Sequence, residues 1–92
     1  MTHLTVTPRQ GGPGFFILDN EGEPIEPMEF YATESDAIRK IYQIEALIDY
    51  VTARPEWYPG DFYWRFPEII ADDWNVIFGI ANWRIRHGEG GP

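Results

Sequence analysis

The chain of 92 residues contains no cysteine, which excludes disulfide bonds, thiolate catalysis and cysteine-ligated zinc. Serine occurs once, as Ser35, and the two histidines, His3 and His87, lie near opposite ends of the chain. Nucleophilic catalysis needs a nucleophile beside an imidazole or another base. Because Ser35 falls at the start of a predicted helix, away from both histidines in the sequence, we predict that the protein is not an enzyme.

Long apolar runs are missing as well. No stretch approaches the roughly 18 residues of a membrane span, and the chain does not open with the basic, apolar and small-residue series of a signal peptide. We therefore expect a cytoplasmic protein. A chain of 92 residues is the size of one domain with one modest core. We expect residues 1–92 to form a single domain, with residues 88–92 as a flexible tail.

Basic charge is scarce. Lysine occurs only as Lys40, and 15 acidic residues against 7 basic ones give a net charge of −8. No basic residue lies between Arg9 and Arg39, where the chain has seven acidic residues: Asp19, Glu21, Glu23, Glu26, Glu29, Glu34 and Asp36. Such a one-sided field repels polyanions and attracts cations. The charge argues against direct binding of nucleic acid or an anionic membrane, and favours a basic protein surface as partner.

The glycine and acidic clusters do not fit a cofactor or a metal ion. Residues 11–14 (GGPG) resemble a phosphate-binding loop only in their glycines, because Pro13 removes an amide donor and no GK[ST] or GxGxxG motif is present. Residues 19–23 (DNEGE) resemble a calcium loop, but the register that centres on Gly22 puts apolar residues at the first and last ligand positions. The sequence therefore predicts no cofactor and no metal site.

The N-terminal third of the chain predicts extended structure. Residues 2–7 alternate between apolar and polar, and residues 15–18 form an apolar run, so both are predicted strands. Asn20-Glu21-Gly22 supplies the residues of a tight turn with positive φ. Residues 24–31 predict an edge strand or an irregular arm, because the two prolines there remove hydrogen-bond donors.

The clearest element is a helix over residues 34–54, which Thr33 can cap and Pro55 ends. Its apolar residues at steps of three and four form one stripe: Ala37, Ile41, Ile44, Ile48 and Val51. Further apolar residues lie outside this stripe: Ile38, Tyr42, Leu47 and Tyr50. A second layer of the same chain, or a second copy in a homodimer through the helix, would cover them.

Beyond Pro55 the pattern is mixed. Residues 67–73 predict a short helix, residues 74–82 fit a helix or a strand, and the alternation in residues 83–86 predicts a terminal strand. We therefore expect an α+β fold. A small antiparallel sheet, made of the N-terminal strands plus the C-terminal strand, packs against one long helix, with a second short helix.

Three sets of residues are candidates for binding a partner. The first is the acidic set Asp19, Glu21, Glu23, Glu26 and Glu29, which we expect to be solvated; its alternative role is to keep the protein in solution. The second is Glu45 and Asp49, which repel each other unless a cation, such as an arginine of a partner, lies between them; the alternative is a solvated polar face. The third lies among six aromatic residues within residues 57–66: Trp57, Tyr58 and Trp64. These are residue types enriched in interface hot spots, and the alternative is core packing.

An acidic α+β domain of under 100 residues, nearly without lysine and without catalytic residues, resembles the small phage-encoded inhibitors called anti-CRISPR proteins, which include DNA mimics. The segments FILDNEGEPI and FYATESDAI are similar to strand–turn–strand–helix units of small phage and bacterial proteins. The resemblance implies a stoichiometric inhibitor in the cytoplasm of a bacterial host. It would cover a basic, nucleic-acid-binding surface of a bacterial defence complex. The alternative function is a structural or accessory protein-interaction module, such as a phage or toxin-system subunit, that uses its aromatic surface.

Overall fold

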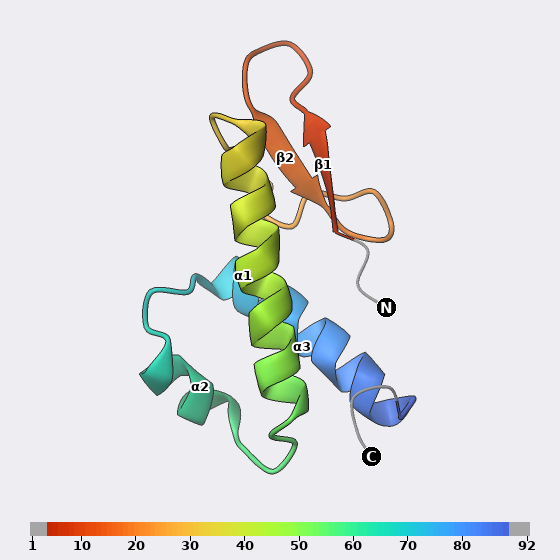
Figure 1. Cartoon of the computed structure of the whole chain (residues 1–92), viewed down its shortest axis with the longest axis vertical. Coiled ribbons are helices and arrows are strands. Elements are labelled where there is room, and N and C mark those ends of the chain that lie inside the picture. The colour runs from red at the N-terminus through yellow and green to blue at the C-terminus, as the bar shows by residue number, and fades with distance from the viewer. Residues whose placement is uncertain (1–3, 89–92) are drawn as a thin grey trace. The chain divides into compact units, whose positions relative to one another are not determined.

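The computed structural model describes residues 4–88 (Figure 1). The elements are strands β1 (Thr5–Pro8) and β2 (Phe15–Leu18) and helices α1 (Glu34–Thr52), α2 (Pro59–Arg65) and α3 (Ala71–Arg86). This content confirms the α+β class and the long helix. The start of the predicted strand at residues 2–7 and most of the predicted tail at 88–92 lie outside the described residues. The chain forms two compact units, one up to Ile44 and one from Glu45 onwards, so that α1 begins in the first and ends in the second.

The first unit contains a β-hairpin. β1 and β2 pair antiparallel, with Val6 opposite Ile17. The predicted third strand at residues 24–31 is an irregular arm that touches β2 at two isolated bridges, Phe15 with Tyr31 and Leu18 with Pro24. The prolines explain this, because each removes one of the donors that a continuous ladder needs.

Alternation in β2 and the stripe of α1 supply the core of this unit. The buried apolar residues are Ile17, Ile25, Ala37, Ile41 and Ile44. The stripe predicted for the helix is therefore confirmed, and it continues with Ile48 and Val51 in the second unit. Within β2, the pleat of the strand turns Ile17 inward and leaves its two neighbours, Phe16 and Leu18, half-buried.

The predicted start of α1 is confirmed, and its end is two residues earlier than predicted. The Thr33 hydroxyl accepts a hydrogen bond from the amide of Asp36 at 3.1 Å, which satisfies one of the free N–H groups of the first turn. At the other end, the Thr52 hydroxyl donates to the carbonyl of Ile48 at 2.7 Å. Arg54 follows the helix and donates to the carbonyl of Tyr50 at 3.0 Å.

The second unit is helical, which corrects two expectations. The predicted short helix at residues 67–73 and terminal strand at residues 83–86 are wrong, since α3 runs without a break from Ala71 to Arg86. The sheet has no C-terminal strand among the residues described. The helix prevails because it buries Trp74, Ile77 and Ala81 on one face, whereas Trp83 and Ile85, which suggested a strand, are exposed.

The sequence pattern did not predict α2, whose first two residues, Pro59 and Gly60, are of the types least favourable inside a helix. Proline suits the first position of a helix, where its missing N–H has no intrahelical partner. The amide of Tyr58 donates to Oδ2 of Asp61 at 2.9 Å, which closes the N-terminus of α2.

Among the described residues, none of these helices combines the length and the apolar character that crossing a membrane would require.

Gly14 ends the hairpin loop in a conformation that other residues rarely adopt, with φ of 111°. A Cβ placed on it would lie 3.0 Å from Cε2 of Phe30 and 3.2 Å from the carbonyl oxygen of Tyr31. We predict that Gly14→Ala lowers the free energy of unfolding by about 2–3 kcal/mol, measured by urea denaturation. Gly11→Ala, which has a positive φ but open space, should cost about 1 kcal/mol, and Gly12→Ala less than that. Equal costs at Gly14 and Gly11 would contradict the steric argument.

Candidate functional site

Asp19, the first residue of the predicted acidic site, holds a turn. Its Oδ1 accepts hydrogen bonds from the amides of Glu21 at 2.8 Å and Glu23 at 3.0 Å. The turn also has backbone hydrogen bonds from Asp19 to Glu23 at 2.9 Å and from Gly22 to Asp19 at 3.1 Å. Gly22 has φ of 81°, which confirms the predicted tight turn with positive φ. Asp19 therefore orders the backbone under the exposed Glu21 and Glu23.

Glu26 is buried, with 5% of its surface exposed, and it accepts a hydrogen bond from the hydroxyl of Tyr31. Our expectation that it is a solvated part of an acidic edge was wrong. The cause is tertiary: the amide of Ile25 donates to the carbonyl of Ile17 at 2.9 Å, which holds this part of the arm against β2. Glu21, Glu23 and Glu29 remain as exposed carboxylates of the predicted acidic set.

The two acids of the second candidate set, Glu45 and Asp49, have different surroundings. Asp49 is exposed, and its Oδ1 accepts a hydrogen bond at 2.9 Å from NH1 of Arg84 on α3. Glu45 is half-buried. A cation does lie against Asp49, as the like-charged spacing suggested, but α3 of the same chain supplies it.

The aromatic set divides between core and surface. Trp64 is 87% exposed and Tyr58 is 79% exposed, whereas Trp57 is half-buried. Between them, Phe62 is 2% exposed. α2 thus buries one aromatic side chain and presents others to solvent, so that neither core packing nor surface exposure describes the whole segment.

Trp57 and Trp64 line one pocket of about 450 Å³ together with Asp61 and Arg65. The guanidinium of Arg65 lies 5.1 Å from the centre of the Trp57 ring. Arg54 also approaches this ring at 5.3 Å, and it lies 3.6 Å from the ring of Tyr50. Cations at these distances from aromatic faces are attracted to the ring electrons and hold the rings in place. We call Trp57, Tyr58, Asp61, Trp64 and Arg65 the α2 surface.

The buried Phe62 ring holds α2 in position. Its centroid lies 5.2 Å from that of Trp57, 5.8 Å from Phe78 and 6.4 Å from Trp74. Tyr50 of α1 is also in contact, at 6.1 Å. These contacts are with side chains of the same unit. They fix the short helix that carries the α2 surface.

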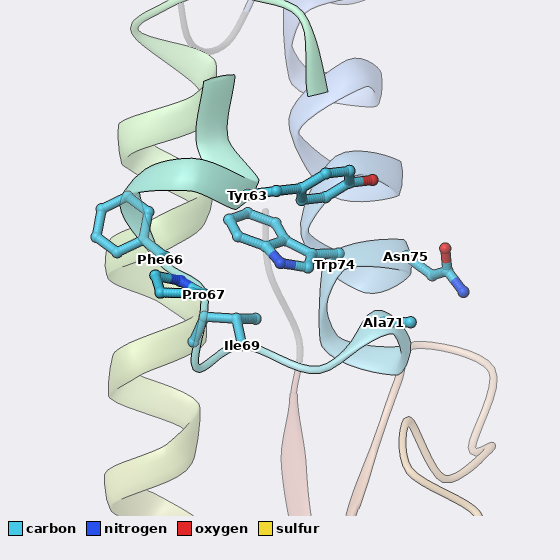
Figure 2. A pocket seen from close by; sticks show the side chains of 7 residues that line it. All are labelled: Tyr63, Phe66, Pro67, Ile69, Ala71, Trp74 and Asn75. Atoms are coloured by element: carbon cyan, nitrogen blue, oxygen red, sulfur yellow. The ribbon is translucent and has the colours of Figure 1, made fainter. Parts of the chain in front are cut away.

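A groove of about 360 Å³ lies between α2 and the start of α3 (Figure 2). Its lining residues are Tyr63, Phe66, Pro67, Ile69, Ala71, Trp74 and Asn75. The sequence did not indicate this groove, because the groove depends on α2, which was not predicted, and on α3 beginning at Ala71. Only the aromatic residues at 63, 66 and 74 were a signal for it.

Among residues 4–88, no group of three or more acidic or histidine side chains is placed so that it could hold a metal ion. Comparison of the chain with protein-family models, with curated protein sequences and with solved structures finds no match.

The turn at Asp19 leads to a stability prediction. Asp19→Ala removes the acceptor of two backbone amides, and we expect it to lower the free energy of unfolding by about 1–2 kcal/mol in urea denaturation. Asp19→Asn keeps an oxygen acceptor and should cost less than half as much. Glu21→Ala removes an exposed carboxylate and should stay within about 0.5 kcal/mol of the wild type. If Asp19→Ala matched Glu21→Ala, the turn would not depend on this side chain.

Proposed function

We propose that the chain is a protein-interaction module without catalytic activity, and that it binds its partner through the α2 surface. The observation that carries this proposal is the exposure of Trp64 and Tyr58, at 87% and 79%, beside a pocket that also contains Arg65. Trp, Tyr and Arg are the residue types that contribute most to protein–protein binding energy.

Energetics and rigidity support the proposal. Large aromatic side chains that remain in water gain nothing for folding, whereas burial in an interface removes about 150–250 Å² of surface for each ring. Phe62 and the hydrogen bond from Tyr58 to Asp61 hold α2 in one conformation. A partner would therefore meet anchors that lose little conformational entropy on binding.

A capture experiment tests the α2 surface. The immobilised full chain retains partner proteins from a bacterial lysate, and mass spectrometry quantifies them. We expect Trp64→Ala to reduce the retained partner at least about tenfold, and Tyr58→Ala to reduce it as well, because hot-spot truncations cost roughly 1.4 kcal/mol or more.

Matched controls separate this surface from general loss of an aromatic residue. Trp83→Ala and Tyr42→Ala remove an exposed tryptophan and an exposed tyrosine that lie outside the α2 surface. Both should retain the partner as the wild type does. If Trp83→Ala reduced the amount of retained partner as much as Trp64→Ala does, this result would contradict the proposed surface.

A second candidate function is an acidic inhibitor of the anti-CRISPR type. Three exposed glutamates favour it, Glu21, Glu23 and Glu29, in a stretch without a basic residue between Arg9 and Arg39. The ordered turn at Asp19 holds the backbone that carries two of them. Such a surface would attract the arginine and lysine side chains of a nucleic-acid-binding partner.

Salt and charge distinguish the two candidates. For the acidic inhibitor, raising the salt concentration from about 0.1 to 0.5 M shortens the Debye length from about 10 Å to about 4–5 Å and should weaken capture strongly. The triple variant Glu21→Gln, Glu23→Gln, Glu29→Gln should weaken it to a similar degree. The control Glu56→Gln removes an exposed acid that lies outside both the groove and the α2 surface, and it is compared with each of the three glutamates changed singly. Capture that is insensitive to both salt and the triple variant would contradict the acidic inhibitor.

A further inference from the structure

The groove between α2 and α3 is separate from the α2 surface. At about 100° per residue, helical spacing puts Tyr63 on the side of α2 opposite Asp61 and Arg65. Accordingly, Asp61 and Arg65 line the pocket of the α2 surface, whereas Tyr63 lines the groove. The groove and the pocket of the α2 surface are therefore different concave surfaces.

The groove has firm aromatic walls. The Tyr63 ring meets the Trp74 ring edge to face, with centroids 5.5 Å apart and an interplanar angle of 66°. Behind them, Trp74 stacks on Phe78 at 5.2 Å and 17°. In Figure 2, Phe66, Pro67 and Ile69 lie on one side of the Trp74 ring. The volume of about 360 Å³ falls within the range of small ligand sites, at roughly 300–1,000 Å³.

The polar groups of the lining favour a ligand that is rich in acceptors. Tyr63 carries a hydroxyl, Trp74 an indole N–H and Asn75 an amide, and all three can donate hydrogen bonds. Figure 2 shows the Tyr63 hydroxyl and the Asn75 amide on the same side of the Trp74 ring. A proline-rich segment in the polyproline II conformation offers free carbonyl acceptors, few N–H groups and flat rings that pack on aromatic side chains.

The acidic residues beside the groove favour basic residues next to the prolines of the ligand. Glu68 lies between the lining residues Pro67 and Ile69, Asp72 follows Ala71, and both acids are exposed. Arg65, the nearest base in the sequence, lines the pocket on the other side of α2. The groove is therefore bordered by negative charge, which is complementary to an arginine or lysine of the ligand.

We propose that this groove binds an extended, proline-rich peptide segment with arginine or lysine beside its prolines. The inference rests on the proposed function as a protein-interaction module and names a chemical class of partner for it. A second copy of this chain is a poor match. Residues 23–27 (EPIEP) are acidic and are held against β2 by hydrogen bonds. The two arginines next to a proline, Arg9 and Arg54, already stack on Phe30 and Tyr50 of their own chain.

A peptide titration tests the groove directly. The probe is a fluorescein-labelled peptide of about ten residues that contains two Pro-x-x-Pro repeats and ends in two arginines. Its anisotropy is measured against the full chain. We expect a Kd between about 10 µM and 1 mM, with loss of binding when the prolines are replaced by alanine and weaker binding when the arginines are replaced by glutamate.

Variants locate the peptide on the protein. Tyr63→Ala and Asn75→Ala should each weaken binding at least about threefold, and Glu68→Gln with Asp72→Asn should weaken the arginine peptide but not a version with glutamine in place of arginine. Because Tyr63 packs on Trp74, thermal unfolding is measured for each variant, and the exposed Asn75, Glu68 and Asp72 carry the test if Tyr63→Ala does not fold. Trp83→Ala, which changes an exposed tryptophan outside both the groove and the α2 surface, should bind the peptide as the wild type does.

Two results would overturn the inference: no binding of the labelled peptide at about 1 mM of the full chain, or binding that these groove variants leave unchanged. If the peptide fails while partner capture still depends on Trp64, then the ligand assigned to the groove is wrong and the α2 surface stands. If the peptide binds in the groove while capture does not depend on Trp64, then the groove stands and the α2 surface is wrong.

Discussion

The second unit depends on the burial of Phe62. α2 has 7 residues, and an isolated helix of this length is not stable in water because helix nucleation is costly. Phe62 supplies the missing stability through ring contacts with Tyr50, Trp57, Trp74 and Phe78. The exposed Trp64, the pocket beside Arg65 and the groove at Tyr63 all lie on an element whose position this one side chain determines.

The acidic residues carry the same chemical group, yet they have different structural roles in this chain. Asp19 accepts two amide hydrogen bonds in a turn, Asp61 accepts the amide that begins α2, and Glu26 is buried against the hydroxyl of Tyr31. Asp49 bonds to Arg84. The number of acidic residues therefore overstates how many carboxylates are available to contact a partner, because these four hold the backbone, are buried or join two helices.

The aromatic residues have two roles within a short distance of chain. Phe62 and Trp74 are buried, Tyr63 and Trp57 form walls of concave surfaces, and Trp64 is exposed. Close packing of the buried rings makes the walls rigid, and a rigid wall binds at a smaller entropic cost than a mobile loop. Stability and the capacity to bind thus come from one cluster, which explains the density of aromatic residues in this part of the chain.

The sequence by itself determined the elements whose pattern is local. The apolar stripe from Ala37 to Val51 predicted α1, the apolar run at residues 15–18 predicted β2, and Gly22 predicted the turn with positive φ. These features depend on the periodicity of apolar residues and on backbone preferences, and both are set by residues close together in the sequence. The absence of cysteine, the single serine and the small number of basic residues likewise narrowed the possible functions without any structure.

Only the tertiary structure decided the remainder. Residues 76–80 are β-branched and aromatic and suit a strand, yet the burial of Trp74, Ile77 and Ala81 on one face makes them part of α3. The sequence predicts that Glu26 is solvated, but the hydrogen bond from Ile25 to Ile17 holds this part of the arm against β2, and Glu26 is buried. The groove at Tyr63 and Trp74 arises from two helices that no local pattern places together. In each case the outcome depends on contacts between different elements of the chain, and the free energy of burial outweighs local preference.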